Sequence, residues 1–325
     1  AFTAADTTLV DGYGHSADRA ILLFTLLKSA GFESELALAA NGTNEASLRK
    51  RNLDIPSNGY FGSLVCRVKQ PGTDTWLPLD LISQYAPLGA TYLDGQPGLT
   101  LDGQSFTWSA PADRKDHDDA RIELEFDAEG TALIRFSKRF HGTAHADFVE
   151  KYSEMTPEER KRHFQALVSD TAQNAVAQDD LETNFDYPGT LRYSLKVEHY
   201  GVKTAKGFYF DLPAVPQQLV SANSSHRERA LLIDGENISS CEWIITAPGG
   251  LKPVIQPESL DWNGPGNFGN VRFQSNAAQE KGKTMLHYKL DLHTGPVIVP
   301  TGNYKDLLEI NRRFNQGSAR RVLLE

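Results

Sequence analysis

Few residues of this sequence have the types and the spacing that catalysis or metal binding requires. The two cysteines, Cys66 and Cys241, lie far apart, and neither belongs to a CxxC or a cysteine–histidine pattern. A structural zinc site needs such ligands at short spacings, so we expect no metal, and no pattern indicates a cofactor. Two isolated cysteines make no disulfide framework, and we expect both to be unlinked. Cys66 lies in a strand-like apolar run, where a buried, inert thiol is expected.

One stretch of the sequence, residues 14–32, carries a recognisable motif. It reads Gly14-His15-Ser16-Ala17-Asp18-Arg19-Ala20-Ile21-Leu22-Leu23 and continues with Leu27, Ala30, Gly31 and Phe32. This stretch resembles the nucleophile segment of bacterial transglutaminase-like (papain-like) domains, which reads roughly G-D-C-K-D-K-A-x-L-L ahead of an apolar helix. In that family the cysteine begins a buried helix, whose dipole and terminal amide groups lower the pKa of the thiol. Ser16 stands at the cysteine position.

Two further motifs of the same family have counterparts downstream. The family places its histidine in a pattern like F-N-H-x-I-V and its aspartate in W-L-D-P-T-x-x-Y-x-P-L-G. Residues 61–65 match the first pattern with Ser63 at the histidine position, and residues 80–89 match the second with Asp80 at the aspartate position. The resemblance therefore implies a remnant triad of Ser16, Ser63 and Asp80, in which only the orienting acid is kept.

We expect this remnant triad to be inactive. A serine hydroxyl is far less acidic than a thiol and needs an adjacent base, and Ser63 cannot act as one. His15 directly precedes Ser16, but neighbours at a helix start project in different directions, so we expect no activation within this pair. An engineered Cys-to-Ser substitution would explain Ser16 and not Ser63. The alternative is an active cysteine-protease-like or transglutaminase-like acyl-transfer enzyme with Ser16 at the nucleophile position.

Hydrophobic patterning predicts the elements that would position these residues. Residues 16–30 are apolar around nearly the whole circumference of a helix, which indicates a helix buried on most sides, and Gly31 ends it. Residues 34–39, 60–69 and 76–81 read as strands. The pattern predicts an α+β unit over residues 1–105, which the resemblance identifies as a truncated transglutaminase-like core.

The rest of the chain has a different pattern. Residues 89–117 are rich in Gly, Pro, Asp and Ser and are predicted to connect two domains. Period-two alternation then predicts a mainly antiparallel β-sandwich domain over residues 118–325. Thr156, Pro157 and Glu159 predict a helix start, so we expect a helical insertion near residues 145–175. The expected strands cover residues 121–126, 134–136, 191–200, 207–212, 230–234, 241–246, 271–274 and 284–293, and a last helix covers residues 304–315.

Charge and hydropathy limit the partners. The formal net charge of −9 comes without a basic stripe, which argues against nucleic acid. No apolar run approaches the about 20 residues that span a bilayer. The domain order resembles bacterial proteins of the DUF3857/transglutaminase-like/DUF3858 type, which implies an exported, periplasmic or cell-surface location. A complete core of that family has helices before the nucleophile, so we expect a protein partner or an upstream segment to cover the N-terminal side. The expected function is a non-catalytic binding or scaffolding module.

Overall fold

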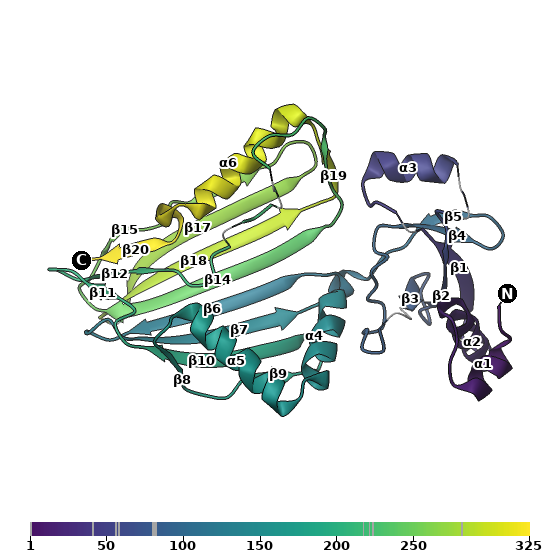
Figure 1. Cartoon of the computed structure of the whole chain (residues 1–325), viewed down its shortest axis with the longest axis horizontal. Coiled ribbons are helices and arrows are strands. Elements are labelled where there is room, and N and C mark those ends of the chain that lie inside the picture. Colours follow the sequence, from purple (N-terminus) through teal and green to yellow (C-terminus); the bar gives the residue numbers. More distant parts are fainter. Residues whose placement is uncertain are drawn as a thin grey trace. The chain divides into compact units, whose positions relative to one another are not determined.

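The structure is a computed structural model and describes residues 2–40, 42–55, 57, 59–79, 83–216, 218–220, 222, 224–280 and 282–325. Helices and many-stranded, mostly antiparallel sheets occur together, so the predicted α+β class is confirmed (Figure 1). The chain forms two compact units. The first contains residues 1–117 and 140–150, and the second contains residues 118–139 and 151–325. The division into a transglutaminase-like core over residues 1–105 and a β-sandwich domain over residues 118–325 stays a prediction.

The first unit is built on a small antiparallel sheet with the strand order β3-β2-β1-β4-β5. Its strands are β1 (Ser34–Ala39), β2 (Ser63–Lys69), β3 (Trp76–Leu79), β4 (Pro97–Thr100) and β5 (Ser105–Thr107). Its helices are α1 (Ala5–Asp11), α2 (Ser16–Ser29) and α3 (Ala46–Asp54), and the unit also contains the start of α4 (Gly142–Glu154). Helix α2 packs against β1, β2 and α1. The motif of residues 14–32 therefore forms a helix that packs on the sheet.

Helix α2 forms where the sequence predicts it but is less buried than expected. Gly31 follows its C-terminal end with a φ of 83°, a left-handed conformation that glycine adopts without strain. Only Ala17, Asp18 and Ala20 of the helix are buried. Its larger apolar side chains are half-buried, and Leu26 is 49% exposed. The expectation of burial on most sides is wrong, because the neighbouring elements leave part of the helix surface open.

The segment predicted to connect two domains is partly built into the first sheet. Strand β4 pairs with β1, and β5 closes a hairpin with β4. Trp108 is buried and packs with Ala37 and Ala39, and its amide donates to the Gln96 carbonyl at 2.9 Å. The prediction of a plain connection is therefore wrong for this part. Strands of three and four residues with Gly and Pro carry too little periodicity to be seen in the sequence.

A mostly buried cation lies on the face of the first sheet that carries Ala37 and Ala39. The Arg67 guanidinium lies 4.7 Å from the ring centre of Trp76 and 3.9 Å from that of Phe106. The same group forms an ion pair with Glu35 on the neighbouring strand. Stacking between two rings satisfies a cation that has lost most of its water, since the side chain is only 13% exposed.

The second unit contains a nine-stranded mixed sheet with the order β16-β17-β18-β14-β6-β7-β10-β8, with β9 also paired to β10, as far as the structure describes it. Strand β14 runs parallel to β6 and antiparallel to β18. The bounds are β6 (Asp118–Phe126), β7 (Ala132–Phe140), β8 (Ala175–Ala177), β9 (Glu182–Asn184), β10 (Gly189–Val197), β14 (Asn237–Pro248), β16 (Leu260–Asn263), β17 (Gly269–Glu280) and β18 (Lys283–Thr294).

Smaller elements cover one face of this sheet. A four-stranded sheet has the order β11-β12-β20-β15, and β13 pairs with β19. These strands are β11 (Val202–Lys203), β12 (Phe208–Asp211), β13 (Leu231–Ile233), β15 (Pro253–Ile255), β19 (Val297–Val299) and β20 (Arg321–Leu324). The helices of the unit are α5 (Pro157–Thr171), with the predicted Thr156–Glu159 capping box, α6 (Tyr304–Asn315), and the end of α4. The two sheets share one core, so the arrangement is sandwich-like.

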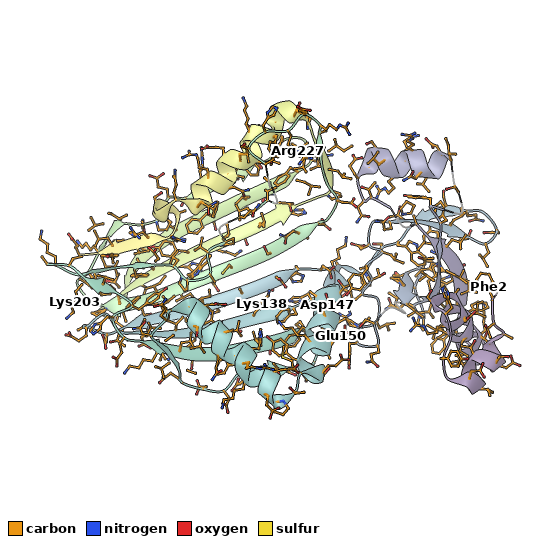
Figure 2. The ribbon with its side chains drawn as sticks, in the orientation of Figure 1. Phe2, Lys138, Asp147, Glu150, Lys203 and Arg227 are labelled. Carbon is orange, nitrogen blue, oxygen red and sulfur yellow. The ribbon has the colours of Figure 1, made fainter. Side chains whose placement is uncertain are left out.

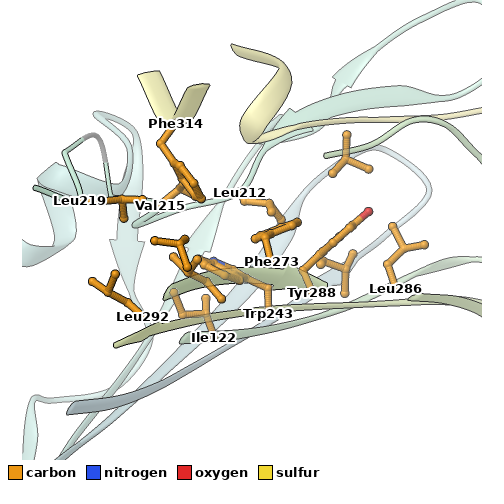
Figure 3. Close-up of a cluster of buried hydrophobic side chains, with 14 of the residues drawn as sticks. Ile122, Leu212, Val215, Leu219, Trp243, Phe273, Leu286, Tyr288, Leu292 and Phe314 are labelled. Carbon is orange, nitrogen blue, oxygen red and sulfur yellow. The ribbon is translucent and has the colours of Figure 1, made fainter. Parts of the chain in front are cut away.

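The core of the second unit follows from strand alternation. On β14 the buried side chains are Trp243, Ile245 and Ala247, every second residue. Figure 3 shows Trp243 and its neighbours from the large sheet below the apolar side chains of α6 and of residues 212–219. The Trp243 indole donates to the Pro213 carbonyl at 2.8 Å, which satisfies the buried nitrogen. This bond ties the segment after β12 to the large sheet.

We predict that Arg67→Lys destabilises the first unit by about 1–2 kcal/mol, because a lysine ammonium cannot stack flat between the two rings. Urea unfolding of the variant and the parent measures the loss. Lys50→Ala is the control, since the Lys50–Asp54 pair is exposed and should contribute less than about 1 kcal/mol. Equal stability of Arg67→Lys and the parent would contradict the role of the stacked cation.

Candidate functional site

The start of α2 is fixed by a buried carboxylate. Asp18 accepts a hydrogen bond from the Thr3 amide at 2.7 Å and one from the His15 amide at 3.1 Å. The bond from Thr3, followed by that from His15, holds the pKa of the Asp18 carboxyl below its ordinary value against the opposing effect of burial. The carboxylate also lies in the first turn, where the helix dipole favours negative charge. Asp18 thereby anchors the turn that carries Ser16.

Ser16 is the first residue of α2 and is exposed. Its Oγ lies 3.4 Å from Nδ1 of His15, so these neighbours do not project apart as the sequence argument assumed. The same Nδ1 accepts a hydrogen bond from the Ala17 amide, also at 3.4 Å, and thereby caps the helix. Both distances are long for hydrogen bonds. His15 is thus a helix cap. The single lone pair at its Nδ1 faces two donors, the Ala17 amide and the Ser16 hydroxyl.

The other two positions of the remnant triad are described only in part. Ser63 is half-buried and begins β2, opposite Ala39 of β1. Asp80 lies outside the described residues. Helix α2 packs against β2, so the elements that carry Ser16 and Ser63 are neighbours. That the side chains of Ser16, Ser63 and Asp80 converge stays a prediction.

The cysteine thiols are in environments that suppress their reactivity. Cys66 is fully buried, and burial raises the pKa of its thiol to about 12. Burial likewise raises the pKa of Cys241 to about 12. Both cysteines are free, which confirms that they are unlinked. At neutral pH both stay protonated, so neither offers a thiolate nucleophile.

Helix α1, which packs beside the helix that carries Ser16, was not predicted from the sequence. Helix α1 packs on α2 and turns only about two times, too short for a periodic signal. Asp6 in its first turn and Gly12 after its end, with a φ of 70°, are the signals that could have located it.

Helix α1 and the residues that follow it expose large apolar side chains. Val10 is 84% exposed and Tyr13 is 78% exposed. We define the N-terminal apolar surface by the exposed side chains of Phe2, Leu9, Val10, Tyr13, Leu26 and Phe32. Phe2 lies at the margin of the first unit, near α1 and α2 (Figure 2). Contiguous exposed apolar surface marks an interaction site more often than single exposed apolar residues do.

The expectations about metals and membrane spans can be compared with the described residues. Within either unit taken by itself, they bring no three histidine, cysteine or carboxylate ligand atoms together at the spacing of a metal site. The expectation of no metal and no cofactor stays a prediction. None of the helices in the described part of the chain combines the length and the hydropathy needed to cross a bilayer.

We predict that Asp18→Asn lowers the melting temperature of the first unit at pH 7. Because the folded-state pKa of Asp18 is lowered, its carboxylate contributes stability above the ordinary aspartate pKa of about 3.9 and loses that contribution as the pH falls through the folded-state pKa. The difference between variant and parent should therefore shrink in acid. Thermal unfolding followed by circular dichroism at several pH values measures it. Asp11→Asn, at an exposed residue of α1, is the control; a difference independent of pH would contradict the role of Asp18.

Comparison with known proteins gives a distant structural similarity. No protein-family model matches this sequence, and no curated protein matches it. A crystal structure from Parabacteroides distasonis, described as a "putative protease", aligns with 98% of this chain at 13% identity and a TM-score of 0.47. The alignment covers 45% of that protein, so this chain spans less than half of its length. A similarity at this TM-score supports no argument about activity.

Proposed function

We propose that this chain is a non-catalytic, transglutaminase-like protein that acts as an exported binding module. The resemblance of residues 14–32, 61–65 and 80–89 to the family motifs supports the family. Serines stand where a thiol and an imidazole would act, at Ser16 and Ser63. The exported location rests on the same resemblance.

The chemistry around Ser16 supports the absence of catalysis. General-base catalysis typically contributes about 10²–10⁴-fold and needs the base within about 2.6–3.2 Å of the atom whose proton it removes. The imidazole of His15 is 3.4 Å away and already accepts from the helix amide of Ala17. A triad also needs a group that orients the base. A hydroxyl at position 63 can neither accept the proton in this way nor be oriented as an imidazole would be.

The observation that carries the binding role is the N-terminal apolar surface. It presents the aliphatic side chains of Leu9 and Val10 from α1 and the phenol ring of Tyr13 just after that helix. Aromatic rings and aliphatic side chains are the groups that form the centre of protein interfaces. Exposed acidic side chains at Asp6 and Asp11 border this surface on the same helix. A protein partner with an apolar depression and a basic rim would complement both features.

A second candidate, an acyl-transfer enzyme with Ser16 as nucleophile, is favoured by one observation. This is the approach of the His15 ring to within 3.4 Å of the Ser16 hydroxyl. A modest rotation of the imidazole would bring Nδ1 into hydrogen-bonding range. The two candidates therefore differ in whether His15 acts as a base or only as a cap.

The activity test separates these two roles. We predict that the parent chain neither hydrolyses generic peptide substrates nor incorporates amines into glutamine substrates above the rate of a Ser16→Ala variant. His15→Asn is the matched variant, because the asparagine carbonyl keeps a helix cap but cannot act as a base. Turnover by the parent that both variants lose would show that Ser16 is a nucleophile with His15 as its base, and would overturn the non-catalytic proposal.

The binding test uses the N-terminal apolar surface. We predict that a photoreactive residue placed at Tyr13 cross-links one defined protein in the producing cells, and that Val10→Glu abolishes the cross-link by placing a charge in an apolar contact. Val176 is also exposed but lies on β8 in the second unit, so a photoreactive residue there is the control. The same cross-linked proteins at both positions, or none at Tyr13, would contradict the binding role of this surface.

A further inference from the structure

The second unit contains a cavity of about 570 Å³ that the proposed function does not use. It lies between α5, strands β7 and β10, and the segment that follows β12. Its size is within the range of about 300–1,000 Å³ typical of small-molecule sites. Residues of the second unit alone line it, and all of them are described.

One wall of the cavity is aromatic and held in a fixed geometry. The rings of Phe136 and Tyr193 stack with their centres 4.7 Å apart and their planes 15° from parallel. Phe164 of α5 contacts Tyr193 edge to face at 5.9 Å. Burial raises the pKa of Tyr193 to about 12, so the phenol is neutral at physiological pH. Tyr193 lines the cavity, and its hydroxyl has no hydrogen-bond partner among the described residues.

The two carboxylates that line the cavity differ in their compensation by positive charge. Asp211 is compensated, because Arg321 lies 3.0 Å and Arg320 lies 3.5 Å from its carboxylate. Asp170, in contrast, has neither a hydrogen bond nor an ion pair in the described part of the chain. It stands in the last turn of α5, which carries no basic residue, so the negative end of the helix dipole adds to its charge. A carboxylate at that end is disfavoured for the helix itself.

The backbone beside the cavity is held in an uncommon conformation. Ala214 has a φ of 57°, in the left-handed region that costs a non-glycine residue roughly 1–2 kcal/mol. Pro213 and Val215 on either side are buried, and the Pro213 carbonyl is bound by Trp243. Exposed Ala214 is thus presented to the cavity by an anchored turn. Residues in such conformations concentrate at ligand sites.

We propose that this cavity binds a small organic amine, with its ammonium group beside Asp170 and its apolar body against the Phe136–Tyr193 pair. Aromatic faces and an unpaired carboxylate together favour a cation over an anion, and an aromatic wall favours a cation with an apolar body over a metal ion. The Tyr193 hydroxyl supplies one hydrogen bond to the ligand. The proposal rests on the second unit alone and does not depend on the function of the first.

The test is an NMR titration of the full chain with phenethylammonium. We expect saturable binding with a dissociation constant of roughly 1 mM or below, and shifts confined to residues around Ala214, Leu167 and Tyr193. 2-Phenylethanol, the neutral analogue, should bind roughly tenfold more weakly, and 3-phenylpropionate should not bind. No saturable binding of the amine, equal binding of all three probes, or shifts elsewhere in the chain would each overturn the proposal.

Variants at Asp170 identify the charge that selects the ligand. Asp170 is exposed, so Asp170→Asn should fold and should weaken binding of the amine roughly five- to tenfold, to the level of the alcohol. Asp170→Lys should abolish binding of the amine and allow 3-phenylpropionate to bind. Asp186→Asn, at an exposed carboxylate outside the cavity, should leave binding unchanged. Amine binding that survives Asp170→Lys would overturn the proposal even if the cavity binds the probe.

Discussion

One-sided burial of extended strands is the constraint on which this structure depends. Successive side chains of a strand point to opposite faces, so a strand with one covered face must alternate apolar and polar residues. Strand β14 does so, with Trp243, Ile245 and Ala247 buried and Glu242 turned to the charged face, where it contacts Arg121. Because the covering elements must fill the apolar face, the segment after β12 and helix α6 are positioned by it.

The same constraint acts in the first unit and sets the surroundings of the candidate site. Cys66 and Arg67 are consecutive in β2, so one is buried in an apolar environment and the other joins the aromatic rings on the opposite face. Ser63 begins the same strand, and Ser16 begins the helix that packs on it. The elements that carry Ser16 and Ser63 are therefore neighbours, and a serine at position 63 cannot take up a proton as an imidazole would.

The sequence predicted the elements with strong periodicity and missed the short ones. Residues 34–39 and 304–315 form a strand and a helix with the predicted bounds, and α2 ends one residue early. Helix α3 is mostly polar, and helix α1 and the two strands of the β4–β5 hairpin are each only a few residues long. None of these elements therefore gave a periodic pattern in the sequence. Motif matching could locate Ser16 and Ser63, but not the cap that brings the His15 ring to the serine hydroxyl, because side-chain direction depends on local backbone geometry. The amine cavity lies between elements distant in sequence, and no local pattern indicated it.

The central claim, that the chain keeps the geometry of a transglutaminase-like site without its chemistry, is tested most directly by restoring the chemistry. The measurement is the pH dependence of thiol alkylation in a Ser16→Cys variant, with and without the additional substitution Ser63→His. If positions 16 and 63 converge, an imidazole at position 63 stabilises the thiolate at position 16. We then expect the midpoint of the alkylation profile to lie about one pH unit or more lower in the double variant than in the single variant. Identical pH profiles of the single and the double variant would contradict the claim.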